Sequence, residues 1–266
     1  MSTQVALVFV LTFIIHLIST LAYALRIAGV RTGRIAVSLA LFNVLVLVSR
    51  TSNTFQGPLL AKHVERNIVG GRAEGAEWDF RWLLVAATLA TLVGGLLVPT
   101  FQRLFTRAIG SFGVHRSVPR LLLRAVTPAG LRALREATSI PAMENLTRLS
   151  LRRAPLRIVA YNVVSTSLIT VGVLSSLYAG YLNPELRVTA NNMSPVINGL
   201  STILLFVYID PHLSIMSDDV AGGRATDAEF RGFVTLLVIG RLAGTLLAQL
   251  LLVPAARVIV FVARNL

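Results

Sequence analysis

The sequence predicts an all-α polytopic membrane protein, with six transmembrane helices arranged as two three-helix inverted repeats and basic amphipathic helices on the cytoplasmic side. Three observations lead to this fold class. Hydrophobic residues make up 55% of the 266 residues and charged residues only 14%, and the mean hydropathy is +0.73. Ordinary soluble domains are about 25% charged. Several apolar runs are long enough to cross a bilayer, and landmarks of the first half of the chain recur in order in the second half.

Six apolar runs approach the length of about 20 residues that a membrane-spanning helix needs. They are 4–25, 35–57, 82–102, 158–182, 195–216 and 232–254. Ala22, Tyr23 and Ala24 fit the pattern of a signal-peptide cleavage site. No basic residue precedes the first run, however, and the run is long for a signal peptide, so we expect it to be a span.

Two stretches of sequence occur twice. "GGRAEGAEWDFR" at 70–81 recurs as "GGRATDAEFR" at 222–231, and "LLVP" at 96–99 recurs at 251–254. Earlier landmarks align at a similar offset: Tyr23 with Tyr178, Arg31 with Arg187, Asn43 with Asn198, and "FQGP" at 55–58 with "YIDP" at 208–211. Ordered matches of this kind indicate two copies of one three-span unit.

An odd number of spans in each copy makes the second copy enter the membrane from the opposite side. We therefore expect three parts: a first three-helix repeat at 1–102, a basic cytoplasmic amphipathic segment at 103–157 and a second three-helix repeat at 158–266. Inverted repeats recur in secondary transporters, whose substrate site lies near the midplane between the halves, so this architecture favours transport or lipid translocation. A homodimer that was fused for structural reasons alone is the other interpretation.

Positive charge is unevenly distributed among the loops of this chain, whose net charge is +13. Most Lys and Arg residues fall in 26–34, 103–157 and 217–231, which lie on one face of a six-span topology. The positive-inside rule predicts that this face is cytoplasmic and that both termini are extracytoplasmic. Leucine and arginine interleave within 103–157, as in amphipathic helices on anionic membrane lipid. Its few aromatic residues argue against a nucleic-acid partner.

The second span contains a polar stripe. Helical periodicity places Asn43, Arg50, Asn53 and Gly57 on one face. An arginine inside a membrane costs about 2.5–3.5 kcal/mol on insertion scales, so it usually faces a cavity or a binding site. Its guanidinium suits phosphate oxygens. The other interpretation is that Arg50 extends toward the headgroups at the outer interface.

No catalytic, metal-binding or cofactor-binding motif stands out. The chain has no cysteine, and its four histidines are scattered. HExxH, GxSxG and Walker motifs are absent from the sequence, so we expect no metal, no cofactor and no enzymatic activity. The alternative is a membrane enzyme or another carrier that acts on polyprenyl-(pyro)phosphate lipids.

Residues 16–60, "HLISTLAYALRIAGVRTGRIAVSLALFNVLVLVSRTSNTFQGPLL", closely resemble the N-terminal signature of the Amj family, the bacterial "alternate to MurJ" lipid II flippases. The length, the six spans and the basic middle segment are also similar to that family. The resemblance implies a multi-pass protein of the bacterial cytoplasmic membrane. It would move lipid II, the undecaprenyl-pyrophosphate-linked peptidoglycan precursor, to the outer leaflet for cell-wall synthesis.

With lipid II as the implied substrate, the polar residues suggest a hypothesis for its site. The proposed pyrophosphate ligands are Arg50, Ser49, Thr51 and Asn53. The proposed cytoplasmic capture site is Arg26, Arg31 and Arg34, and the cavity would be lined by His16 and Asn43. Asp210 and Arg241 form a possible relay or ion pair. The second copy has "STILLFVYIDP" where the first has the Arg50 stretch, so folding alone does not require this arginine, which favours a ligand.

Overall fold

The computed structural model describes residues 3–71, 75–115, 127–139 and 155–266, and every regular element in these residues is a helix. Six helical segments are long and apolar enough to cross a membrane. They are Thr3–Thr32, Ile35–Val69, Ala76–Gly110, Leu156–Leu182, Pro184–Ala221 and Asp227–Asn265. The predicted all-α, six-span fold class is thereby confirmed.

Four of these segments are single helices, and Ala76–Gly110 is the first part of a longer helix. Pro184–Ala221 is built from several shorter helices. The helices are α1 (Thr3–Thr32), α2 (Ile35–Val69), α3 (Ala76–His115), α5 (Pro128–Ala137), α7 (Leu156–Leu182), α8 (Arg187–Asn192), α9 (Ser194–Leu204), α10 (Asp210–Ala221) and α11 (Asp227–Asn265). A 3-10 turn, Pro184–Leu186, precedes α8, and a π-helical turn, Leu205–Ile209, joins α9 to α10. A π-helical turn is rare and shifts the helix face that follows it.

The helices extend well beyond the predicted apolar runs. The run 82–102, for example, lies inside the 40-residue helix α3. At 1.5 Å per residue α3 is about 60 Å long, about twice the thickness of the hydrocarbon layer. Polar turns continue the helix into the aqueous region, where hydropathy no longer marks it. Pro58, Pro99 and Pro254 accordingly lie inside helices.

The predicted amphipathic segment 103–157 is described only in part. Its first residues continue α3 to His115, and α5 is a short helix capped by the Thr127 side chain. α5 lies against α3, where the Ser139 amide donates to the Thr100 hydroxyl at 3.0 Å. The predictions for 116–126 and 140–154 lie outside the described residues.

Local sequence accounts for the tight turns between neighbouring helices. Gly33, between α1 and α2, has φ 63°, a value that side chains on L-residues rarely tolerate. Gly223, before α11, has φ 73°. α11 then begins with a capping box, in which the Thr226 hydroxyl accepts from the Glu229 amide at 3.2 Å and Glu229 accepts from the Thr226 amide at 2.9 Å.

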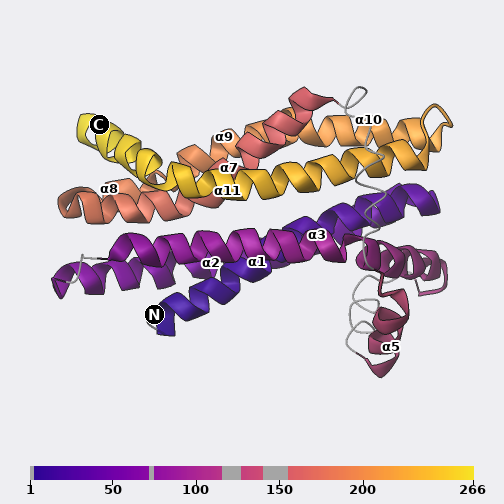
Figure 1. The fold of residues 1–266 in the computed structure, drawn as a ribbon, viewed down its shortest axis with the longest axis horizontal. Coiled ribbons are helices and arrows are strands. Elements are labelled where there is room, and N and C mark those ends of the chain that lie inside the picture. Colours follow the sequence, from indigo (N-terminus) through magenta and orange to yellow (C-terminus); the bar gives the residue numbers. More distant parts are fainter. Residues whose placement is uncertain (1–2, 72–74, 116–126, 140–154) are drawn as a thin grey trace.

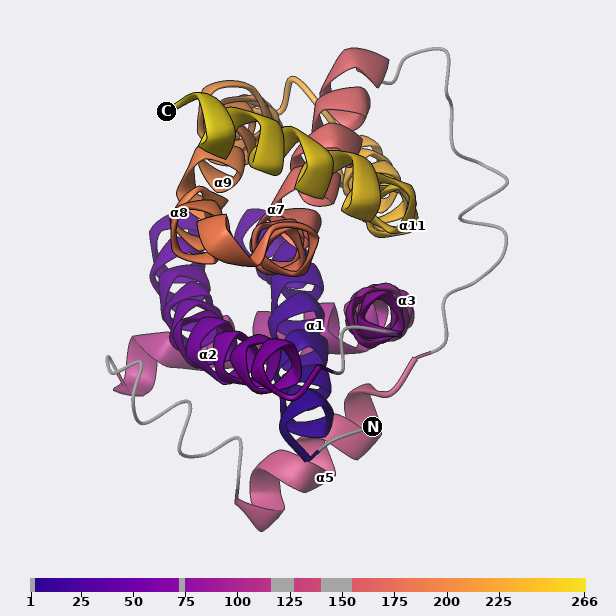
Figure 2. The ribbon, with the colours of Figure 1, turned by 90° about the vertical axis from the view of Figure 1, so that its left-hand side faces the viewer.

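The long helices form two layers. α1 packs against α2 and α3, and α7 packs against α9 and α11 (Figures 1 and 2). The layers meet where α3 contacts α11 and α7, α1 contacts α11 and α10, and α2 contacts α7. In Figure 1, α1 and α3 run toward the right while α7 and α11 run toward the left. Corresponding helices of the two layers therefore run in opposite directions, as an inverted duplication requires.

Two buried clusters contain residues that the repeated sequence aligns. One holds Tyr178 with Phe80 and Leu60, and the other holds Tyr23 with Phe230 and Leu213. Each cluster therefore combines the tyrosine of one half with the phenylalanine of the other half's motif. The inverted duplication stays a prediction, but the residues that it aligns occupy equivalent positions in the two buried clusters.

The connecting turns gather at two ends of the molecule. Arg26, Arg31 and Arg34 lie in the last turns of α1 and the turn that follows it, so we call this end the arginine end. It also holds the turn before α11 and the distal part of α3 (Figure 1). Arg31 pairs with Asp227 at 3.2 Å, and Arg34 donates to the Ile109 carbonyl at 3.0 Å. The predicted grouping of these loops on one face agrees with these contacts. The opposite end holds the end of α2, the turn after α7 and the C-terminus (Figure 1).

Glycines allow the helices in each layer to cross closely. A Cβ on Gly94 of α3 would lie 2.8 Å from the Thr20 Cβ of α1. A Cβ on Gly244 of α11 would lie 2.6 Å from the Val163 carbonyl oxygen of α7. Small residues are typical of close helix crossings in membranes.

Gly244→Ala should lower the thermal stability of the purified protein in detergent. The added methyl group meets backbone as well as the Thr166 side chain, and overpacking of this kind costs about 1–3 kcal/mol. The midpoint of thermal denaturation measures the effect. Gly199→Ala is the matched control, because a Cβ there meets no atom within 4 Å. Equal midpoints for both variants would contradict the close crossing.

Candidate functional site

A hydrogen-bond network joins α1, α7 and α11 in the interior. The Tyr23 hydroxyl donates to Asn162 Oδ1 at 3.2 Å, and Asn162 Nδ2 donates to the Leu237 carbonyl at 2.7 Å. Asn162 is only 2% exposed. A buried amide is costly unless it is hydrogen-bonded, so this residue fixes how the three helices meet.

Arg241 lies one turn beyond Leu237 on α11, beside Tyr23 and near His16. Its Nε is fully buried and has no hydrogen-bond partner in the described part of the chain, although the residue as a whole keeps intermediate exposure. His16 is 7% exposed, and its Nδ1 also has no partner there. Among the described residues no carboxylate lies within ion-pair distance of Arg241.

Asp210 pairs with Arg26 at 3.3 Å, whereas the sequence suggested Arg241 as its partner. The π-helical turn immediately before Asp210 sets the direction of its side chain, and α10 lies beside α1, which carries Arg26. Arg26 also lies over the Phe42 ring, 5.1 Å from its centroid. Asp210 and Arg26 therefore neutralise each other, and Asp210 is not the partner of Arg241.

The other two arginines of the predicted capture site also have protein partners. Asp227 is shared between Arg31, at 3.2 Å, and Arg231, at 3.1 Å. Arg34 donates to the Ile109 and Gly110 carbonyls near the end of α3. The structure thus brings Arg26, Arg31 and Arg34 to one end. The Arg31–Asp227 pair is partly exposed, with side-chain exposures of 33% and 36%, and such surface pairs contribute only about 0–1 kcal/mol.

The predicted stripe on α2 lies largely on its outward side. Asn43, Thr51 and Asn53 are exposed and Ser49 is half-buried, while the Arg50 side chain lies outside what the structure describes. The Thr51 hydroxyl donates to the Leu47 carbonyl at 2.9 Å within the helix. His16 is buried beside Arg241, whereas Asn43 is exposed. The lining of one cavity by His16 and Asn43 stays a prediction.

Sequence analysis missed two buried amides. Asn162 follows Tyr161 within an apolar run, and an amide inside a predicted span is itself the signal that would have drawn attention to it. Gln56 of α2 donates to the Thr12 hydroxyl of α1 at 2.9 Å. In the sequence it stands out only as part of the "FQGP" repeat landmark.

Metal binding finds no support in the described residues, because no three of their His, Asp or Glu side chains are grouped to hold an ion. The potential chemistry of the interior is hydrogen bonding and charge from Tyr23, Asn162, His16 and Arg241.

Comparison with known proteins gives two matches. The family described as "Alternate to MurJ" (Amj) matches residues 11–263. The chain is also similar to the Lipid II flippase Amj of Bacillus subtilis (strain 168), with 39% identity over 256 residues, which covers 96% of this chain and 95% of the relative. No solved structure matches the chain significantly.

Replacement of both Arg26 and Asp210 should destabilise the protein by less than the sum of the two single replacements. Arg26→Met leaves the Asp210 carboxylate without its cation, and Asp210→Asn leaves the guanidinium without its anion. We expect each single variant to lose about 1–3 kcal/mol, and the double variant to lose less than the sum. Thermal denaturation in detergent gives the comparison. Arg107→Gln, which breaks a pair with exposed side chains, is the control. Additive losses would show that the pair is not coupled.

Proposed function

The chain belongs to the Amj family, and from this premise we propose that it is a flippase that translocates lipid II across the bacterial cytoplasmic membrane for cell-wall synthesis. Lipid II carries a charged pyrophosphate and a polar glycopeptide on a polyprenyl chain. Translocation moves this lipid without changing its covalent structure, so the protein acts as a transporter and not as an enzyme. The difficult step is the passage of the pyrophosphate through a layer that contains no water.

The observation that carries the proposal is the Arg241 guanidinium, which has no carboxylate partner among the described residues where α1, α7 and α11 meet. A cation inside the membrane costs about 2.5–3.5 kcal/mol on insertion scales, and an anion that pairs with it reduces this cost. Pyrophosphate oxygens match the donor fork of a guanidinium. His16 and Tyr23 lie beside Arg241 and add neutral hydrogen bonds.

We extend the proposed route to the polar stripe of α2. Arg50, with Ser49, Thr51 and Asn53, would contact the pyrophosphate from that helix, and Asn43 would line the route toward the arginine end. Arg26, Arg31 and Arg34 would capture the lipid there. The Arg31–Asp227 pair is partly exposed, so an anionic ligand is able to exchange with Asp227. The polyprenyl chain would stay in the bilayer.

The two layers would expose this route alternately, as two inverted three-helix repeats at 1–102 and 158–266 do in secondary transporters. The opposite directions of α1 and α7 support this architecture (Figure 1). Gly57 and Pro58 in α2, and Pro211 in α10, lie at aligned positions where each middle helix is able to bend.

Purified protein in proteoliposomes should make lipid II of the inner leaflet accessible from outside while leaving it chemically unchanged. We expect Arg241→Gln and Arg50→Gln each to reduce the rate at least tenfold, because each removes a cation from the route. Arg264→Gln, at the exposed C-terminal end of α11, is the matched control. Accessibility is measured with an external enzyme that modifies the headgroup, and the lipid is recovered for mass analysis.

Recovery of lipid with an altered headgroup would identify an enzyme instead. Wild-type rates for both variants, at equal protein levels, would remove Arg241 and Arg50 from the route. The thermal denaturation midpoint of each variant separates loss of transport from loss of folding.

We also propose that the arginine end faces the cytoplasm, where 103–157 contacts anionic lipid, and that both termini are extracytoplasmic. The uneven distribution of basic residues supports this orientation.

Single cysteines report the orientation directly, because the chain contains none. Val69→Cys lies at the opposite end and is 89% exposed. A membrane-impermeant maleimide should label it in intact cells, whereas Arg132→Cys, on α5, should be labelled only after lysis. The reverse pattern would invert the proposed topology.

A further inference from the structure

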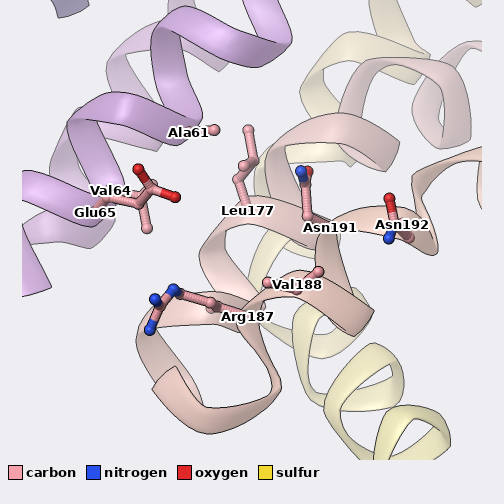
Figure 3. Close-up of a pocket in the computed structure, with 9 residues that line it drawn as sticks. Ala61, Val64, Glu65, Leu177, Arg187, Val188, Asn191 and Asn192 are labelled. Atoms are coloured by element: carbon pink, nitrogen blue, oxygen red, sulfur yellow. The ribbon is translucent and has the colours of Figure 1, made fainter.

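A pocket that is open to solvent lies at the opposite end, between α2, α7 and α8 (Figure 3). Its walls carry Glu65 on α2, and Arg187, Asn191 and Asn192 on α8. Ala61, Val64, Leu177, Gly180 and Val188 complete the lining. Figure 3 shows Glu65 and Arg187 on facing walls.

The polar groups of this pocket are largely unused by the protein. Glu65, Arg187, Asn191 and Asn192 are all exposed. In the described part of the chain, Arg187 makes one long contact, a 3.4 Å bond to the Pro184 carbonyl, and no ion pair. A guanidinium, two amides and a carboxylate are thus available for a ligand that carries both anionic oxygens and hydroxyl or amide groups.

The pocket continues the predicted polar face of α2. Asn43, Arg50 and Gly57 follow one another at intervals of seven residues, about two helical turns, and the next interval reaches Val64, beside Glu65. One side of α2 therefore leads from the arginine end, along Arg50, to this pocket. Its position fits the far end of the proposed route.

Arg187 also departs from the symmetry of the repeats. The sequence aligns it with Arg31, whose partner is Asp227. In the repeated motif Gly75 stands where the second copy has Asp227, so the first copy carries no acid at this position. Arg187 makes no ion pair in the described part of the chain, and it lines the pocket.

We propose that this pocket is a second binding site, which holds the phosphorylated sugar portion of the transported lipid's headgroup before release. The inference rests on the proposed lipid II translocation. Arg187 binds an anionic oxygen, while Asn191, Asn192 and Glu65 bind hydroxyl and amide groups of the sugar.

Site-specific photo-crosslinking tests the site on the full chain in proteoliposomes that contain lipid II. Benzoylphenylalanine replaces Val188, which lines the pocket and is 66% exposed. The same replacement of Val258, which is 61% exposed on α11 and outside the lining, is the matched control. We expect crosslinks to lipid II at least fivefold stronger at 188 than at 258. Arg187→Gln or Glu65→Gln should reduce the yield at 188 severalfold, and Arg264→Gln should leave it unchanged.

Competitors identify what is recognised. Undecaprenyl pyrophosphate, which lacks the sugar, should compete weakly, and excess phosphatidylglycerol should not compete. Displacement by phosphatidylglycerol would show a site for any anionic lipid and would overturn the proposal, as would equal crosslinking at 188 and 258. A wild-type protein that crosslinks at 188 but does not translocate would support the site and refute the flippase function. Translocation without preferential crosslinking at 188 would support the flippase function and refute the site.

Discussion

The arrangement of the helices depends on one side chain, Asn162, which uses both ends of its amide. It accepts from Tyr23 on α1 and donates to the Leu237 carbonyl on α11, while its own helix, α7, belongs to the other layer from α1. Inside a bilayer no water is present to hydrogen-bond an amide, so the amide needs protein partners. These bonds therefore fix the register of the three helices. Gly240 makes room for the amide, since a Cβ there would lie 3.2 Å from Asn162 Nδ2. Arg241 follows directly and is thereby placed beside Tyr23.

The two halves share a framework and differ in chemistry. Phe80 and Phe230 are both fully buried at aligned positions, and each packs in a cluster with the tyrosine of the other half. Tyr178, however, donates to Glu77, whereas Tyr23 donates to Asn162. Both halves keep the same apolar packing because apolar side chains need only neighbours of suitable volume, not particular partners. A polar group needs a particular partner. When one partner differs between the halves, each half is left with different charged groups for a ligand.

Much of the fold follows from hydropathy, because a bilayer selects long apolar helices and little else. The sequence therefore predicts six spans but not their ends, which continue as polar turns outside the hydrocarbon layer, as in α3 beyond residue 102. It predicts that Arg26, Arg31 and Arg34 lie together, since they flank one turn. It does not predict the partner of Asp210, because a π-helical turn leaves no periodic signal. The Arg50 ligand stays a prediction, and Asn162 shows that a lone amide within an apolar run carries information.

The strength of the protein's own contacts differs along the proposed route. At the arginine end, Arg31 shares Asp227 with Arg231, and the exposure of this pair keeps it weak. Arg241 has no acid within reach among the described residues, and Arg187 has one long bond to a carbonyl. At each of these arginines, a phosphate group is thus able to replace a weakly held protein partner or to supply one that is missing. Movement across a membrane requires sites that bind well enough to accept the ligand yet weakly enough to release it. Several single guanidiniums in succession satisfy that requirement better than one cluster, which would hold the pyrophosphate in place.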